Sequence, residues 1–222
     1  MATRLEFKGY KALLYALIII LLAFPVLQDF TYVGLVTGVV LVGVLLVAVR
    51  AVAKRRWQIV ISGILGTAAT IGYFGNLLGL GAGFEPVGML GFGLFFLTVG
   101  IIIITDIMLH IRHVTSELIY GSINVYLLVG ISFAFAHALV EFIQPGSISG
   151  LESLSMGDTS VMPFIYYSFV TMTTLGYGDL SPVTGPAASL AYVQAVFGQL
   201  YIAITIARLM ALYVANETDQ GQ

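Results

Sequence analysis

The 222-residue sequence contains no cysteine, so it forms neither disulfides nor thiolate metal sites. Charged residues are also scarce, at 9% of the chain, whereas 59% of the residues are hydrophobic. So little polar surface cannot enclose a soluble core, and the apolar runs are long enough to cross a bilayer. The sequence therefore predicts an integral membrane protein.

Sequence motifs of hydrolytic and redox enzymes are absent as well. No HExxH, GxSxG or Walker phosphate-binding pattern occurs in the chain. We therefore expect no enzymatic activity, no organic cofactor and no nucleic-acid partner.

Long apolar runs predict six transmembrane helices of roughly 20 residues, the length that crosses about 30 Å of hydrocarbon. The runs cover residues 12–27, 31–50, 59–80, 86–110, 119–143 and 185–213. The apolar segment 161–173 is too short to span and predicts a re-entrant helix. The expected fold class is thus an all-α membrane protein. A cleaved signal peptide is the alternative for the first run, but residues 23–29 lack a small-x-small cleavage pattern.

All nine Lys and Arg residues fall on one side of this predicted topology. They precede the first span, separate the second from the third and the fourth from the fifth, and end with Arg208. Because cytoplasmic flanks of membrane helices hold an excess of such residues, we expect both termini in the cytoplasm. The chain is short and has no long tails, which favours a prokaryotic cell membrane.

Residues 171–179 read Thr-Met-Thr-Thr-Leu-Gly-Tyr-Gly-Asp, between the re-entrant segment and the last span. Glycine adopts backbone conformations that are forbidden to most other residues. Gly176 and Gly178 therefore allow successive carbonyl groups to point toward one axis. The side chains of Leu175 and Tyr177 are then expected to point away from that axis and to pack in protein.

This stretch resembles the selectivity filter of potassium channels, in which backbone carbonyls replace the hydration shell of the ion. The resemblance covers roughly residues 119–213, as outer helix, pore helix, filter and inner helix. It implies that K⁺ binds the carbonyls of Thr174, Leu175, Gly176 and Tyr177, with the Thr174 hydroxyl at the inner end. The function it implies is passive, selective conduction of K⁺.

The chain contains only one such filter. A K⁺ pore needs four filter strands, so the resemblance implies a homotetramer in which each chain has three identical partners and contacts membrane lipids. Two alternatives remain open at this point. One is a weakly selective cation channel, and the other is a non-conducting scaffold or sensor with a vestigial pore.

Five residues are expected to support the filter: Thr173, Asp179, Tyr166, Tyr167 and Val170. Tyr166 and Tyr167 occupy positions where the family often has a Trp-Trp pair around the filter tyrosine. Val170 stands where some relatives have a glutamate that bonds to the aspartate after the filter. Asp179 therefore needs a different partner, for which Tyr167 is the candidate.

The last span contains a glycine near its middle, Gly198, where many such channels have a hinge. Close packing against a neighbouring helix is an equally good explanation. Ile202, Thr205, Ile206 and Met210 follow and are expected to line the inner cavity, where an apolar ring gates by dewetting.

Two parts are predicted: a four-helix, sensor-like domain over residues 1–116 and a pore domain over residues 117–222. A working voltage sensor moves several charges through the field, each worth about 2.3 kcal/mol per 100 mV. No Lys or Arg occurs between Trp57 and Ile111, so we expect no gating by an arginine ladder. The segment after residue 213 is too short for a ligand-binding domain.

Glycines crowd the four leading helices and favour tight helix contacts, with a lipid or effector pocket as the alternative. The glycines in question are Gly34 and Gly38, Gly72, Gly75 and Gly79, and Gly88, Gly91 and Gly93.

The candidate gating or pH-sensing residues are Asp106, His110, His113, His137 and Glu141. Asp106 is expected to pair with Arg112 or Arg50. His137 and Glu141 are spaced i, i+4 and are expected to interact near the outer membrane surface. The sequence does not identify the stimulus that opens the pore.

Overall fold

The computed structural model describes residues 9–27, 33–110, 115–153 and 161–220. These residues are mainly helical, as predicted. The helices are α1 (Gly9–Leu27), α2 (Val33–Val52), α3 (Arg56–Leu77), α4 (Phe84–His110), α5 (Ser116–Ile143), α6 (Met162–Met172) and α7 (Gly185–Gln220). A 3-10 helix (Leu151–Ser153) and two strands, β1 (Ile148–Ser149) and β2 (Ser181–Pro182), complete the described elements.

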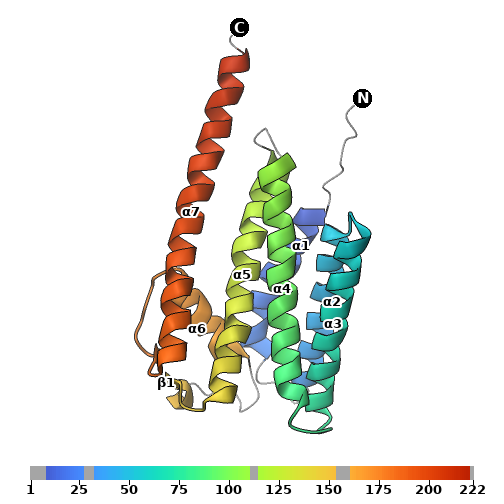
Figure 1. Ribbon diagram of the computed structural model, residues 1–222, viewed down its shortest axis with the longest axis vertical. Coiled ribbons are helices and arrows are strands. Elements are labelled where there is room, and N and C mark those ends of the chain that lie inside the picture. Colours follow the sequence, from blue (N-terminus) through green and yellow to red (C-terminus); the bar gives the residue numbers. More distant parts are fainter. Residues whose placement is uncertain (1–8, 28–32, 111–114, 154–160, 221–222) are drawn as a thin grey trace.

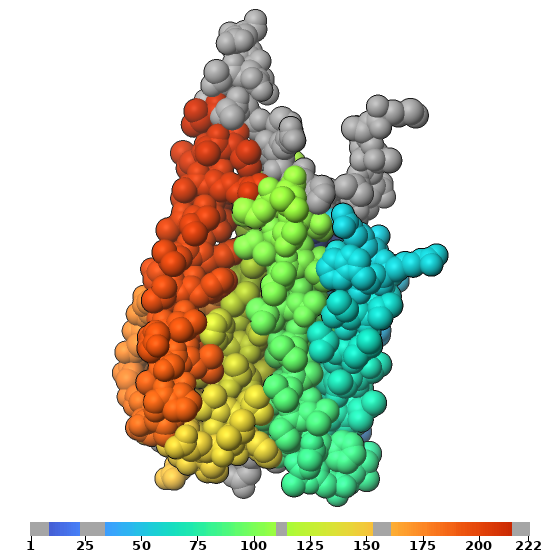
Figure 2. All heavy atoms as spheres, in the orientation of Figure 1, coloured from blue at the N-terminus to red at the C-terminus, as the bar shows by residue number. Residues whose placement is uncertain are grey.

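Five of the helices, α2 to α5 and α7, are long and apolar enough to cross a membrane. The part of α1 whose side chains are described, Gly9–Leu22, is apolar but shorter. Within the chain, 61% of the apolar stretch of α5 is buried, compared with 6% of that of α7. Figure 2 shows α7 along one edge of the molecule.

The four leading helices pack into one bundle with α5 (Figure 1). Helix α4 lies between α3 and α5, and α1 contacts both α2 and α5. Stacked phenylalanine rings hold α4 against α5, with 5.1 Å between the ring centres of Phe92 and Phe135 and 6.2 Å between those of Phe96 and Phe135. The core of the molecule therefore runs along the α4–α5 contact.

Glycines allow α3 and α4 to approach closely. A Cβ added to Gly72 would collide with the backbone of Gly88, and one added to Gly91 would lie 2.6 Å from the backbone nitrogen of Ala69. Backbone atoms cannot move aside as a flexible side chain can. The prediction of tight helix contacts is confirmed for Gly72, Gly88 and Gly91, whereas Gly79 lies after the end of α3, has a φ of +68° and has open space where a Cβ would be.

The basic residues that the structure describes gather at one end of the bundle. Helix α1 begins at this end, α4 and α7 end there, and the turn between α2 and α3 lies there too (Figure 1). Strand β1 and the end of α5 lie at the opposite end, where β1 pairs antiparallel with β2. The predicted one-sided distribution of Lys and Arg is confirmed for the described residues.

Candidate ion-conduction site

A short helix is present where the sequence predicts one. This helix, α6, lies between α5 and α7 and contacts both (Figure 1). At its carboxyl end, the amide and the hydroxyl of Thr173 both donate to the carbonyl of Phe169, at 3.0 and 2.7 Å. Thr173 thus satisfies a carbonyl that the last helical turn leaves open. The extended segment that follows, residues 173–178 and called the strand below, begins at a point fixed by two neighbouring helices.

The backbone amides at the start of this strand turn back toward α6. The amide of Thr174 donates to the carbonyl of Thr171 at 3.0 Å, and those of Leu175 and Gly176 donate to the carbonyl of Val170 at 3.0 and 3.4 Å. Val170 therefore contacts the strand through its main chain.

Because the N–H and C=O of a trans peptide point in opposite directions, these hydrogen bonds also orient the carbonyl groups. The carbonyls of Thr173, Thr174 and Leu175 point away from α6. Three successive carbonyl oxygens consequently line one side of the strand.

Alternate residues of the strand adopt the left-handed conformation. The φ angles are 58° at Thr174, 58° at Gly176 and 81° at Gly178. Thr174 is the one non-glycine residue with positive φ among the described residues, and such a conformation is uncommon and strained for threonine. The predicted role of Gly176 and Gly178 in an unusual backbone is confirmed, and Thr174 shares it.

The strand's large side chains are poorly covered. Leu175 is 55% exposed and Tyr177 is 67% exposed, so one chain does not cover them, and their packing in protein stays a prediction. The Tyr177 ring is stacked on that of Tyr166, with 6.5 Å between ring centres and an interplanar angle of 9°. Within one chain, the Tyr166 ring thus covers one part of Tyr177, and most of the Tyr177 surface stays exposed.

Asp179, after the strand, is held by Tyr166. The Tyr166 hydroxyl donates to Oδ2 of Asp179 at 2.6 Å, and this bond holds the pKa of the Asp179 carboxyl below its usual value. The prediction that Tyr167 bonds to Asp179 is wrong. Successive residues of a helix point about 100° apart, and Tyr167 turns inward, where its ring packs edge-on against His137 at 4.7 Å.

Gly198 brings α7 into direct contact with the end of α6. An added Cβ would collide with the Met172 carbonyl oxygen and lie 2.9 Å from Met172 Cγ. Of the two explanations from sequence, the structure favours close packing, and α7 continues as one helix through this residue.

The residues expected to line the inner cavity are open within one chain. Ile202 is 41% exposed, Ile206 56% and Met210 58%, and Thr205 is half-buried. Their facing a cavity stays a prediction. The sequence interpretation missed Gln199, whose Nε2 lies 3.4 Å from the Thr174 hydroxyl oxygen.

A buried polar network joins α5, α6 and α7. His137 Nε2 lies 2.8 Å from Gln194 Oε1, Gln194 donates to Ser168, and the Ser168 hydroxyl donates to the Gly130 carbonyl at 2.6 Å. The predicted surface pairing of His137 with Glu141 is wrong. The i, i+4 spacing brings two residues near each other on α5, but it does not determine which neighbouring helix each one meets.

Sequence reasoning missed Ser168 and Gln194. A signal for them existed, because an uncharged polar side chain within an apolar membrane helix is costly unless it is hydrogen-bonded. Three such residues in α5, α6 and α7 therefore point to mutual contact.

Glu141 instead fixes the loop after α5. Its two carboxylate oxygens accept from the amides of Gly146 at 2.6 Å and Ile148 at 2.9 Å. Two residues further on, Gly150 has a φ of +89°, and a side chain there would collide with the carbonyl oxygen of Asp179. The loop is thereby held against the segment that follows the strand.

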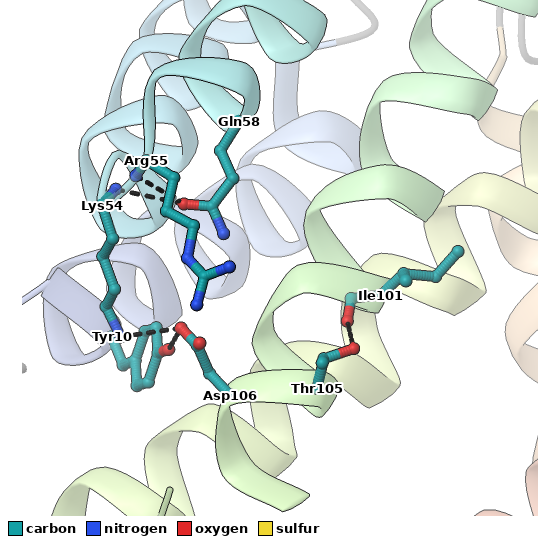
Figure 3. A network of polar contacts seen from close by, with 7 residues as sticks. All are labelled: Tyr10, Lys54, Arg55, Gln58, Ile101, Thr105 and Asp106. Atoms are coloured by element: carbon teal, nitrogen blue, oxygen red, sulfur yellow. Dashed lines mark hydrogen bonds and ion pairs between the residues drawn. The ribbon is translucent and has the colours of Figure 1, made fainter. Parts of the chain in front are cut away.

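A charged cluster lies at the basic end of the leading helices (Figure 3). Asp106 Oδ2 accepts from Lys54 Nζ at 2.7 Å and from the Tyr10 hydroxyl at 3.2 Å. The Gln58 side chain accepts from the backbone amide of Arg55 at 2.9 Å, and Figure 3 shows the Arg55 guanidinium directed toward Asp106.

Lys54, not Arg50, forms the ion pair with Asp106, so the expected pairing with Arg50 is wrong. Arg50 is on the last turn of α2, whereas Lys54 lies in the following turn, which faces the end of α4. Arg112 lies outside the described residues.

Arg208 of α7 reaches the carboxyl end of α4. Its Nη2 donates to the carbonyls of Ile107 at 2.8 Å and Met108 at 3.2 Å. These are among the last four carbonyls of α4, which have no partner within the helix. His113 and the side chain of His110 lie outside the described residues.

The second half of the chain is the part that a comparison with known families recognises. Residues 123–215 match the sequence model of a family described as an ion channel. The matched segment contains most of α5, all of α6, the strand and most of α7. No curated protein and no solved structure matches the chain.

The ion channel match supports passive ion conduction by a transport protein rather than an enzyme. Together with five helices that are long enough to cross a membrane, it indicates a multi-pass membrane protein.

Proposed function

We propose that this chain forms a homotetrameric, K⁺-selective channel that conducts K⁺ passively down its electrochemical gradient. The observation that carries this proposal is the backbone of residues 173–178. Three successive carbonyls point away from α6, and alternate residues have positive φ. K⁺ would bind the carbonyls of Thr174, Leu175, Gly176 and Tyr177, together with the Thr174 hydroxyl.

A strand of this kind works only when other strands face it. One row of oxygens covers one side of a cation, whereas dehydrating K⁺ requires oxygens on all sides. Four copies around one axis satisfy that requirement with closed symmetry.

The exposed surfaces support the same assembly. Leu175, Tyr177 and most of α7 are apolar and uncovered within one chain. In a tetramer, the neighbouring subunit's α6 and α7 would cover the filter side chains and part of α7. Lipid covers the rest.

The orientation follows from the basic end of the bundle. Lys54, Arg55 and Arg56 lie there and are exposed, so this end faces the cytoplasm in the proposed channel, and the filter opens outward. With α1 as a sixth span, both termini are cytoplasmic. The host membrane is the cell membrane, and a prokaryotic one is proposed.

The four leading helices do not act as an arginine-based voltage sensor in this proposal. Helices α3 and α4 carry no Lys or Arg between Trp57 and His110, so they have no series of positive charges that the transmembrane field could move. We propose instead that they support α5, against which α1 and α4 pack.

A flux assay tests the proposal. Purified protein in liposomes should pass K⁺ far better than Na⁺, and Ba²⁺ should block the flux. Equal passage of both ions would support a weakly selective cation channel instead. No flux from well-folded protein would support a scaffold or sensor role.

A further inference from the structure

Three fully buried polar side chains, one each from α5, α6 and α7, are hydrogen-bonded to one another. They are His137 of α5, Ser168 of α6 and Gln194 of α7, each with no exposed surface. Buried polar groups are stable only when they are hydrogen-bonded, so their mutual arrangement is strongly determined.

The hydrogen bonds determine which atom donates at each step. Gln194 Nε2 lies 2.9 Å from the Ser168 carbonyl oxygen, which only accepts, so this atom is the amide nitrogen. Gln194 Oε1 therefore faces His137, and His137 Nε2 carries the proton. His137 Nδ1 is buried and has no hydrogen-bond partner among the described residues. The imidazole is consequently neutral, because a charged ring would bury an unpaired N–H.

All donors then run in one direction around the three helices. His137 on α5 donates to Gln194 on α7, Gln194 donates to the Ser168 carbonyl and, at 2.6 Å, to its hydroxyl on α6, and that hydroxyl donates to Gly130 on α5. The path begins and ends on α5. It links the short helix to both neighbouring helices at once.

The network lies close to the residues that orient the filter. Ser168 is two residues before Val170, whose carbonyl accepts the amides of Leu175 and Gly176. Gln194 is one helical turn before Gly198, which contacts the end of α6. A rotation or shift of α6 would therefore move the filter carbonyls.

We propose that His137, Ser168 and Gln194 are positioning residues for the filter and that they set its preference for K⁺ over Na⁺. This inference rests on the proposed function. The network fixes the rotation and depth of α6 relative to α5 and α7, and α6 in turn orients the strand. Apolar side chains of the same size would preserve packing but not this orientation.

The test uses the full-length protein assembled in lipid bilayers, with the K⁺/Na⁺ permeability ratio measured from reversal potentials. Gln194→Met keeps the length of the side chain and removes its hydrogen bonds. We expect the ratio to fall by about tenfold, as for residues that orient the ligands of an ion. Selectivity, rather than expression or total flux, is the readout, because a residue important only for folding would change the amount of channel and not the ratio.

Two serine substitutions distinguish an effect of the network from a general effect of helix packing. The Ser168 hydroxyl donates to the Gly130 carbonyl, and the Ser132 hydroxyl donates to the Gly93 carbonyl at 2.8 Å, between α5 and α4. Ser168→Ala should lower the permeability ratio, whereas Ser132→Ala should leave it unchanged. Ser168→Ala removes a single oxygen and serves as the test where Gln194→Met does not assemble.

Two substitutions at His137 test whether the hydrogen bond to Gln194 is what matters for selectivity. His137→Gln places an amide N–H near the position of the histidine Nε2–H and should retain most of the selectivity. His137→Leu should not.

The possible failures are distinguishable. A wild-type protein without K⁺-selective flux would overturn the proposed function. A selective wild type whose ratio is unchanged in Gln194→Met and Ser168→Ala, or equally lowered in Ser132→Ala, would overturn this inference alone.

Discussion

The chain covers the apolar surface of its first five helices far better than that of the filter strand and α7. Helix α5 is 61% buried over its apolar stretch, whereas α7 is 6% buried over its own, although both are long and hydrophobic. The filter side chains Leu175 and Tyr177 share the exposure of α7. The bundle is thus largely complete within one chain, whereas in the proposed channel partner subunits and lipid cover the filter strand and α7.

The two regions also differ in their polar contacts. At the basic end of the bundle, Lys54 and Asp106 form an ion pair whose side chains are 28% and 13% exposed. Between α5, α6 and α7, the contacts of His137, Ser168 and Gln194 are neutral and fully buried. Charges occur where water or lipid headgroups are near, and neutral hydrogen bonds occur where neither is. Substitutions at the ion pair should therefore change stability slightly, whereas substitutions near residues 173–178 should change ion permeation.

The largest effect is expected at Gly176. Alanine there must adopt a φ of +58° at a cost of about 1–2 kcal/mol per copy, although the added Cβ has open space. Since four copies would form the pore, we expect K⁺ flux in liposomes to fall by at least about tenfold. The control is Gly43→Ala in α2, where an added Cβ also meets nothing, and flux should be unchanged.

A smaller effect is expected at Gly198, where alanine would press on the Met172 carbonyl. Overpacking of this kind costs about 1–3 kcal/mol, so the thermal midpoint of the purified protein should fall. Gly63→Ala in α3, where an added Cβ is unhindered, should not lower it. A Gly198→Ala protein with normal stability but altered opening would favour the hinge explanation over packing.

At the basic end, Lys54→Gln should reduce the free energy of unfolding by only about 1 kcal/mol, because the pair is partly exposed. The Tyr10 hydroxyl still donates to Asp106 in this variant. Chemical denaturation in detergent measures the change, and Arg56→Gln serves as the charge-matched control. The K⁺/Na⁺ permeability ratio should be the same in both variants, and a changed ratio in Lys54→Gln alone would contradict the separation of the two regions.

The smallest effect is expected from Tyr166→Phe, which removes the hydrogen bond to Asp179. That bond lowers the pKa of Asp179, so its contribution to stability is present above the unfolded pKa and is lost as pH falls through the folded pKa. Without the bond, the variant lacks this contribution, and its Asp179 carboxylate should be protonated at a higher pH than in the wild type, so any effect of that protonation on flux should begin at a higher pH. A pH series of flux with acid on the filter side measures the shift. Identical profiles would show that the bond does not matter for conduction.

Sequence patterns predicted the helices and the unusual backbone at Gly176 and Gly178 because both depend on local properties. An apolar run of about 20 residues specifies a membrane helix, and glycine at alternate positions specifies an unusual backbone. Contacts between elements were predicted poorly. Asp179 meets Tyr166 rather than Tyr167, and His137 meets Gln194 rather than Glu141. Such pairings depend on how each helix is rotated toward its neighbours, which spacing along one helix does not determine.

The reversal potential of purified protein in a bilayer, with K⁺ on one side and Na⁺ on the other, tests the central claim most directly. If carbonyl oxygens from four identical strands replace the water around K⁺, the current should reverse near the K⁺ equilibrium potential. A reversal potential near zero, with equal permeation of the two cations, would contradict the account.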